Sequence, residues 1–305
     1  TDAGAFPSPT DAPATEPSPP ARSVPVPPLP PGRALDLPGR GTTFIRHGEG
    51  PPRAPTLLLL HGWTASADLN WFPEYGPLSE HWNVLAIDHR GHGRGIRSDD
   101  RFRLADCADD AAAACAALGV DRVIAVGYSM GGPIAQLLWH RHRELVEGLV
   151  FCATSRNFRG KPGEKLTFRA MGGLSVLARG TPDSWRRRAA LRVLAGRTGE
   201  GTYGPWALQE YRRGEPHTII EAGAALGRYS SHEWVHEIDV PTAVVVTELD
   251  QIVPPHRQRK LAAAIPGATV HPVQGDHVCC VQGADRFVPV LLDACADVTA
   301  RLPHP

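Results

Sequence analysis

A serine between two glycines is the first set of residues that could do chemistry. The segment from Gly127 to Gly131, GYSMG, has Ser129 at its centre, follows the β-branched run Val123–Val126 and precedes a helical pattern over Met130–His142. A strand, a tight turn and a helix would present the serine hydroxyl above the end of the strand, an arrangement called a nucleophile elbow. Since such a strained turn leaves room only for hydrogen beside it, Gly127 and Gly131 fit those positions. Ser129 is therefore predicted to be a nucleophile.

Negative charge that develops on a substrate oxygen needs hydrogen-bond donors, and two backbone amides are candidates. The Met130 amide lies at the start of the predicted helix, where backbone N–H groups have no helical partner. The Trp63 amide comes after the predicted strand Leu57–Leu60 and the pair His61-Gly62. Gly62 would permit a close approach of this segment to the serine. We assign the oxyanion hole to these two amides. The alternative for the second is an ordinary turn at a strand end.

A neutral serine hydroxyl is a weak nucleophile, so a base must take its proton and a carboxylate must stabilise the resulting imidazolium. Fourteen histidines compete for the role of base. His277 lies after the last predicted strand and before the C-terminal helix, and we predict it as the base. The competitors His61, His89 and His92 lie on loops expected at the same edge of the sheet.

Asp250 is the predicted acid because it lies in the loop after a β-branched run and before a helix. It is preferred over Glu248 in the same loop. Asp276 is next to the proposed base in sequence, but neighbouring residues rarely aim their side chains at each other, and Asp239 precedes its strand at the opposite edge. The resulting chain order is serine, aspartate, histidine.

Short apolar runs alternate with helical patterns from Thr42 onward. Such runs, bounded by Gly, Pro or charged residues, indicate buried strands of a mostly parallel sheet in a doubly wound α/β fold. The predicted strands are Thr43–Arg46, Leu57–Leu60, Val84–Asp88, Val123–Val126, Leu149–Cys152, Ala243–Thr247 and Thr269–His271. The predicted helices are Leu104–Leu118, Met130–His142, Pro255–Ile265 and Ala284–Leu302.

The domain organisation follows from this alternation. Residues 1–33 contain eleven prolines, which favour extended conformations and indicate a flexible tail. Residues 34–154 and 235–305 form the predicted α/β core. Residues 155–234 offer helical patterns without a convincing strand, which indicates a helical cap inserted over the carboxyl edge of the sheet.

The predicted cap is strongly basic. Between Arg156 and Arg197 it has eleven Lys or Arg residues against Glu164 and Asp183. This charge indicates a solvated helix face, and the alternative is attraction of anionic substrates or peripheral contact with a membrane surface. Six apolar residues could either pack the cap or line a site for an acyl chain: Phe158, Phe168, Met171, Leu174, Trp185 and Leu191.

The overall composition limits the function classes. A chain of 305 residues with zero net charge gives no indication of nucleic-acid binding. The longest obvious apolar run, Leu57–Leu60, is far too short for a membrane span, so we expect a soluble protein. The sequence starts at Thr1 without methionine and leaves the compartment and the oligomeric state open. Its six cysteines lack metal-binding spacing and are expected to be buried thiols, with Cys279 and Cys280 close to the proposed base.

Five short sequence blocks occur in this order along the chain: His61-Gly62-Trp63, Asp88–Gly93, Gly127–Gly131, Asp250–Pro254 and Gly275–His277. The blocks and their order resemble the α/β-hydrolase superfamily, in its esterase, lipase and perhydrolase-like group, and the resemblance covers residues 42–302. The resemblance implies that the histidines of the second block organise a turn. It also implies no cofactor and no metal, in agreement with the lack of ligand-spaced His or Cys.

The expected function is hydrolysis of a carboxylic ester, lipid-like or with a small acyl group, through an acyl-enzyme intermediate on Ser129. The expected partner is a small-molecule ester. A serine at this position argues against epoxide and haloalkane hydrolases, which resemble the group but have aspartate there. The alternatives are an acyltransferase or perhydrolase with the same triad, and a ligand-binding member of the fold without turnover.

Overall fold

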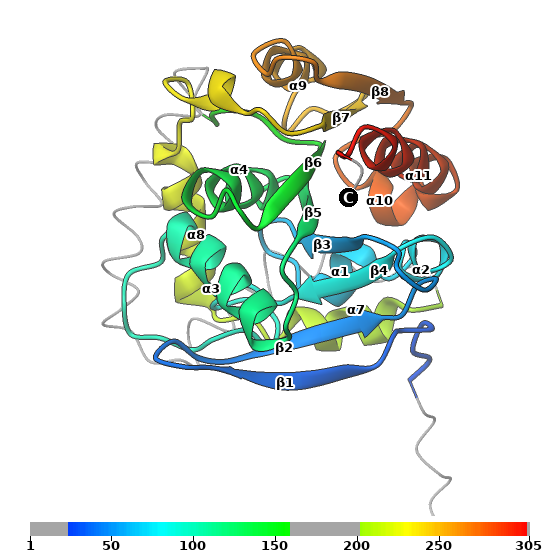
Figure 1. Ribbon diagram of the computed structural model, residues 1–305. Coiled ribbons are helices and arrows are strands. Elements are labelled where there is room, and N and C mark those ends of the chain that lie inside the picture. The colour runs from blue at the N-terminus through cyan, green and yellow to red at the C-terminus, as the bar shows by residue number, and fades with distance from the viewer. Residues whose placement is uncertain (1–23, 159–201, 304–305) are drawn as a thin grey trace, which may run out of the picture.

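The computed structural model describes residues 24–158 and 202–303, and its centre is an eight-stranded sheet (Figure 1). Neighbouring strands follow the order β1-β2-β4-β3-β5-β6-β7-β8. Strands β3 to β8 are parallel, whereas β2 pairs antiparallel with both β1 and β4. The strands are β1 Gly32–Leu37, β2 Gly41–Gly48, β3 Thr56–Leu60, β4 Asn83–Ile87, β5 Val123–Tyr128, β6 Val146–Cys152, β7 Thr242–Thr247 and β8 Thr269–Val273.

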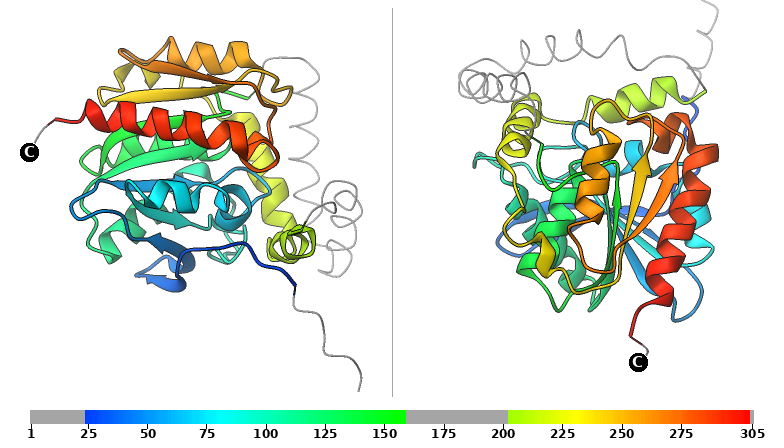
Figure 2. Two further views of the ribbon diagram at one scale, coloured as in Figure 1. Left: turned by 90° about the vertical axis from the view of Figure 1, so that its right-hand side faces the viewer. Right: turned by 90° about the horizontal axis from the view of Figure 1, so that it is seen from above.

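Helices cover both faces of the sheet (Figure 2). Helices α3, α4 and α9 contribute to one hydrophobic core, and α1, α2, α10 and α11 contribute to the other. Two further helices, α7 and α8, follow β6 in the chain. The bounds are α1 Ala67–Trp71, α2 Tyr75–Ser79, α3 Leu104–Ala117, α4 Gly131–Arg141, α7 Gly204–Tyr211, α8 Pro216–Arg228, α9 Pro255–Ala262, α10 Cys279–Gln282 and α11 Ala284–Ala300.

The apolar runs of the central strands follow from burial on both faces. In β3, Leu58 and Leu60 pack into the core formed with α3 and α4, whereas Leu57 and Leu59 pack into the core on the opposite face. Side chains of a strand alternate between faces, so a strand with helices on both sides is apolar at every position. This burial explains why runs such as Leu57–Leu60 could be recognised without any alternation.

The prediction of a doubly wound, mostly parallel α/β fold is confirmed. Each predicted strand and helix corresponds to an observed element, with ends that differ by a few residues. The prediction missed β1, α1, α2 and α10. Strand β1 lies at the sheet edge and buries only two of its six residues, and the three helices have four or five residues, too few to show a helical period.

The expected tail ends earlier than residue 33. Strand β1 starts at Gly32, and the chain before it already contacts the sheet, since the carbonyls of Pro30 and Pro31 accept hydrogen bonds from the Arg46 side chain and the His47 amide. A proline keeps its carbonyl as an acceptor, so a proline-rich segment can still bond to the outside of β2. Residues 1–23 lie outside the described residues.

Of the expected cap, the structure describes residues 155–158 and 202–234, which include α7 and α8. The Glu215 amide donates to the Gly91 carbonyl (2.8 Å), and Glu221 accepts from the Phe102 amide (2.9 Å), so α8 bonds directly to core loops. Phe158 is buried in the core with α3 and α4. The other five apolar residues named above, and most of the basic stretch, lie outside the described residues.

None of the helices in residues 24–158 and 202–303 combines the length and hydrophobicity that crossing a membrane requires.

Candidate active site

The sheet topology has a switch point between β3 and β5. The chain continues from β3 to β4 on one side and then returns to β5 on the other side, so neighbouring connections diverge at this point. In open α/β sheets such a switch point leaves a crevice at the carboxyl ends of the strands, where ligands bind. Residues 61–63 follow β3 and Ser129 follows β5, so both segments lie at this switch point.

Ser129 lies on a strained turn between β5 and α4. Its φ of 50° is in the left-handed region, which is unusual for a residue other than glycine. A methyl group on Gly127 would lie 2.4 Å from the Gly131 carbonyl oxygen, and one on Gly131 would lie 2.0 Å from the Leu60 carbonyl oxygen. The Thr154 hydroxyl donates to the Ser129 carbonyl (2.7 Å) and supports the turn. Only glycine fits at the positions two residues before and two residues after this serine.

Ser129, His277 and Asp250 form a continuous chain of hydrogen bonds. His277 Nε2 lies 3.0 Å from Ser129 Oγ, and His277 Nδ1 lies 2.7 Å from Asp250 Oδ2. The three residues come from the turn after β5, the loop after β8 and the loop after β7. The Tyr128 hydroxyl donates to the His277 carbonyl (2.9 Å) and holds the loop of the histidine. The fold thus brings together three residues that are far apart in sequence.

The Asp250 carboxylate is buried, and both of its oxygens accept hydrogen bonds. Oδ1 accepts from the amides of Ile252 (2.8 Å) and Val253 (2.9 Å), and Oδ2 accepts from the Thr247 hydroxyl (2.9 Å) as well as facing His277. These bonds fix the carboxylate in place, so that Oδ2 can orient the imidazole.

The other candidate acids point elsewhere. Glu248 pairs with Arg259 of α9, at the surface. Asp276 accepts from the Val278 amide (3.1 Å), a local bond within its own loop. The structure places neither carboxylate against the His277 ring.

The segment after β3 passes directly beside the serine. A methyl group on Gly62 would lie 3.4 Å from Ser129 Cβ. On the other side of Ser129, Met130 is the first residue of the turn into α4. The two amides assigned to the oxyanion hole, those of Trp63 and Met130, therefore belong to the segments that flank the serine. The Trp63 indole N–H donates to the Ile219 carbonyl of α8 (2.7 Å), so this residue also links the crevice to the described part of the cap.

His61 is a structural residue of this segment. Its Nε2 accepts from the His89 amide (2.9 Å), so in the neutral ring Nδ1 carries the proton and donates to the Gly62 carbonyl (2.8 Å). The Gly62 carbonyl and the Trp63 amide belong to one planar peptide group and point in opposite directions. By holding the carbonyl, His61 determines which way the Trp63 N–H points.

The competitors His89 and His92 are also buried next to His61, with ring centroids 4.2 and 5.5 Å from it. Burial lowers the pKa of His89 to about 3 and that of His92 to about 4, and it lowers the pKa of His61 as well. These rings are therefore neutral near pH 7. Within the described part of the chain, no group of three or more His, Cys, Asp or Glu side chains could hold a metal ion.

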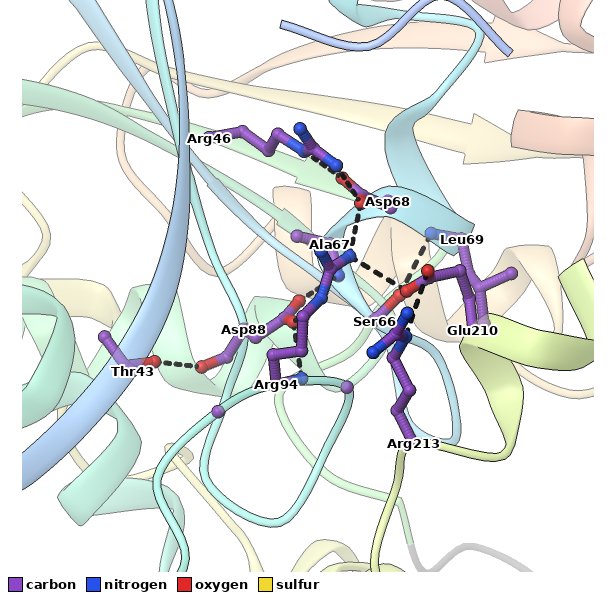
Figure 3. A network of polar contacts seen from close by, with 12 residues as sticks. Thr43, Arg46, Ser66, Ala67, Asp68, Leu69, Asp88, Arg94, Glu210 and Arg213 are labelled. Carbon is purple, nitrogen blue, oxygen red and sulfur yellow. Dashed lines mark hydrogen bonds and ion pairs between the residues drawn. The ribbon is translucent and has the colours of Figure 1, made fainter. Parts of the chain in front are cut away.

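A polar network anchors α1 behind the crevice (Figure 3). Ser66 caps the helix, with its hydroxyl accepting from the Leu69 amide (3.2 Å). Asp88 accepts from the amides of Ala67 and Arg94, both at 2.7 Å, and burial raises the pKa of Asp88 to about 6. Asp88 thereby ties the start of α1 to the turn after β4.

Asp68 extends this network to α7. Its buried carboxylate accepts two hydrogen bonds from Arg46 (2.9 and 2.8 Å) and one from Arg94 (2.6 Å) (Figure 3). Arg94 also donates to Glu210 of α7 (2.8 Å), which in turn accepts from Arg213 (3.1 Å). Sequence reasoning missed this network. The Ser66 cap followed by an acidic residue was the local signal that could have indicated α1.

The cysteines do not offer a nucleophile. All six are buried and free. Burial raises the pKa of Cys279 to about 12 and also raises that of Cys280, so neither forms a thiolate near pH 7. The expectation of buried apolar thiols is confirmed.

Comparison with known proteins agrees with the fold. A family model described as the alpha/beta hydrolase fold matches residues 55–188. A poly(3-hydroxyalkanoate) depolymerase from Ectopseudomonas oleovorans is 26% identical over 259 residues, which cover 82% of this chain and 87% of that protein. A bifunctional esterase/perhydrolase from Acinetobacter calcoaceticus is 40% identical over 93 residues, which cover 30% of this chain and 33% of that protein.

Among solved structures, a hydrolase from Pseudomonas aeruginosa PA01 superposes with a TM-score of 0.71 at 22% identity, covering 87% of this chain and 98% of that chain. The sheet order, the strained serine turn and the family match agree with one another: the chain has the α/β-hydrolase fold, and residues 55–188 are similar to that family. The names of the two relatives, a depolymerase and an esterase/perhydrolase, agree with a hydrolase of this fold.

Proposed function

We propose that the protein is a serine hydrolase that cleaves a carboxylic ester through an acyl-enzyme intermediate. The observation that carries this proposal is the chain of hydrogen bonds from Ser129 Oγ through the His277 ring to the Asp250 carboxylate. Nucleophile, base and orienting acid lie within hydrogen-bond distance and in the roles that acyl transfer requires. Two backbone amides beside the serine complete the arrangement.

In the proposed mechanism, Ser129 Oγ attacks the ester carbonyl carbon while His277 Nε2 takes the hydroxyl proton. The amides of Trp63 and Met130 donate to the oxygen that becomes negative in the tetrahedral intermediate. His277 then returns the proton to the leaving alkoxide, and the acyl group stays on the serine. Water, deprotonated by His277, attacks the acyl-enzyme in the same way and releases the acid. Asp250 stabilises the imidazolium in both steps.

An apolar rim beside the acid and the base supports an ester with an apolar group. Leu249, Ile252 and Val278 are exposed by 58, 64 and 43% of their surface, although large apolar side chains are usually buried. Each of them lies within two residues of Asp250 or His277. An apolar acyl or alcohol group of the substrate would cover this rim. The names of two relatives, a polyester depolymerase and an esterase/perhydrolase, agree with ester substrates.

Perhydrolysis is a second candidate because the esterase/perhydrolase shares 40% identity over 93 residues. The same triad transfers an acyl group to peroxide instead of water when the site favours peroxide. Product analysis after incubation with ester and hydrogen peroxide distinguishes the two: peracid above the uncatalysed level supports acyl transfer to peroxide, and acid alone supports hydrolysis.

Covalent labelling tests the proposal directly. We expect a fluorophosphonate to add one adduct to the wild type, seen by intact mass, and none to Ser129→Ala. Hydrolysis of p-nitrophenyl esters should fall by about 10³-fold or more in the same variant, because the nucleophile is lost. Ser98→Ala removes a hydroxyl in a surface loop and should leave labelling and turnover unchanged.

A series of p-nitrophenyl esters of increasing acyl length, assayed on the wild type, measures the preferred acyl group. A folded wild type that is neither labelled nor active on any of these esters would contradict the proposal. That outcome would favour a binding protein that keeps the triad without turnover.

A further inference from the structure

We propose that the Asn70 side chain is a positioning residue that keeps the oxyanion hole preformed and joins it to the loop of the base. This inference rests on the proposed function, because it concerns the Trp63 amide as an oxyanion donor. Asn70 lies in α1 and is almost completely buried. It touches neither the serine hydroxyl nor the His277 ring in any hydrogen bond within the described residues, so its effect must be exerted through the segments that it holds.

Asn70 holds the residue that precedes the proposed donor. Its side-chain oxygen, Oδ1, accepts from the Gly62 amide at 2.8 Å. A methyl group on Gly62 would lie 3.2 Å from this oxygen and 3.4 Å from Ser129 Cβ, so the bond forms right beside the nucleophile. A buried amide without a partner is costly, and Asn70 removes that cost only while the segment keeps its present conformation.

Together with His61, Asn70 fixes both peptide groups that flank Gly62. Asn70 holds the N–H of one peptide group, and His61 Nδ1 holds the carbonyl of the next, at 2.8 Å. The second peptide group contains the Trp63 N–H. Rotating either group would leave a buried polar atom without its partner. The Trp63 amide therefore keeps its direction before substrate arrives, which is the preorganisation that oxyanion stabilisation requires.

The other end of the same side chain reaches the base loop. Asn70 Nδ2 lies 3.9 Å from Cys280 Sγ, a weak contact with a sulfur acceptor. Cys280 belongs to α10, which starts two residues after His277. A carboxamide offers an acceptor on one side and a donor on the other without a charge. Asparagine therefore fits a position between residues 61–63, the oxyanion segment that carries the proposed Trp63 donor, and α10, which follows the base.

The helix that carries Asn70 is itself held firmly. Asp88 and Asp68 tie α1 to the turn after β4 and to β2 through the network of Figure 3. Glu74, four residues further along the chain, is fully buried, and burial raises its pKa well above the usual range. Burial also raises the pKa of the Cys280 thiol on α10.

Asn70→Asp separates this positioning role from simple packing, because the two side chains have the same shape. A protonated aspartic acid can still accept from the Gly62 amide, but an ionised one places negative charge beside the developing oxyanion. We expect kcat on a p-nitrophenyl ester to fall about 10- to 100-fold, part of the effect of losing an oxyanion donor, with KM changed less than about threefold. The loss relative to the wild type should grow as pH rises, because a larger fraction of the introduced aspartate is then ionised.

Asn83→Asp is the matched control. Asn83 also accepts from a backbone amide, that of Gly50 (3.0 Å), and donates to a carbonyl, that of Ala54 (2.8 Å), but it starts β4 at the end of the sheet away from the crevice. The kcat of Asn83→Asp and its dependence on pH should match those of the wild type. Asn70→Gln is a second variant without a new charge; it displaces the amide by one methylene and should lower kcat at every pH.

Two outcomes are distinguishable. Wild-type kcat and pH dependence in folded Asn70→Asp, or wild-type kcat in Asn70→Gln if the first variant does not fold, would overturn the positioning role while labelling of Ser129 upholds the serine mechanism. A folded wild type without labelling or turnover would overturn the serine mechanism, and this inference with it.

Discussion

At the scale of single residues, the serine turn has almost no free space. Ser129 has a left-handed backbone, and Gly131 faces the backbone of β3 so closely that a methyl group would lie 2.0 Å from a carbonyl oxygen. A clash with backbone cannot be relieved by rotating a side chain. The turn and the end of β3 must move apart if this glycine is replaced, and the oxyanion segment begins at the end of β3.

Gly131→Ala is therefore expected to lower the free energy of unfolding by about 1–3 kcal/mol through overpacking, and to lower ester turnover as well. Gly76→Ala is the matched control: no atom lies within 4 Å of the added methyl group, and the residue lies in α2. It should stabilise the protein by about 0.5–1 kcal/mol, since alanine is the better helix former. Urea unfolding of both variants measures the difference. Equal stability of the two would refute the close packing.

At the scale of elements, α7 is connected to the core through Arg94. This guanidinium bridges Asp68 at the start of α1 and Glu210 in α7, and it lies over the Phe44 ring at 3.8 Å. Both carboxylates are buried, and each keeps one other arginine, Arg46 or Arg213, as a partner. The bridge is thus a direct ionic link between α1 of the core and α7 in the described part of the cap.

Arg94→Met should lower the free energy of unfolding by about 2 kcal/mol, because it removes charge-assisted hydrogen bonds to two buried carboxylates. Arg141→Met removes a comparable pair with Asp109, but the Arg141 side chain is 44% exposed, against 25% for Arg94. A surface pair of this kind contributes less than about 1 kcal/mol. Denaturant unfolding compares the two variants. A loss in Arg141→Met as large as that in Arg94→Met would show that the bridge has no special role.

At the scale of the whole molecule, buried histidines should make stability depend on pH. Burial lowers the pKa of His89 to about 3, whereas an unfolded histidine titrates near about 6.5. Below that pH His89 binds a proton in the unfolded chain but stays neutral in the folded protein. His89 therefore costs no stability above about pH 6.5 and lowers stability progressively as pH falls toward its folded pKa. Asp88, with its pKa raised to about 6, acts with the opposite sign.

A variant isolates this contribution. In His89→Leu the unfolding free energy should decline less steeply on acidification than in the wild type, by about 1.4 kcal/mol per pH unit between about pH 6 and pH 4.5. Asp88 is present in both proteins, so its effect cancels in the difference. His256→Gln, at an exposed position, should keep the wild-type slope. Parallel pH dependence of His89→Leu and the wild type would show that His89 is not a buried neutral ring.

The core strands and long helices were predictable because their signals are local. A continuous apolar run indicates a strand buried on both faces, and the glycines around Ser129 indicate a turn that excludes side chains. His277 and Asp250 could be chosen by their place after strands, since carboxyl ends of parallel strands share an edge. The short elements, β1, α1, α2 and α10, have no such run or helical period, and the Ser66 cap of α1 is a weaker local signal, because their conformation depends on what packs against them.

The sequence by itself thus determined the fold class and the set of residues able to do chemistry. Only the tertiary structure decided which of these residues meet. Hydrogen bonds across long sequence separations, such as the one between Ser129 and His277 and the one between Gly62 and Asn70, depend on strand order and loop direction, which no local pattern encodes. The role of Asn70 is the clearest case: in the sequence it is an ordinary polar residue in a short helix, and its burial beside Gly62 comes from the packing of α1 against β3.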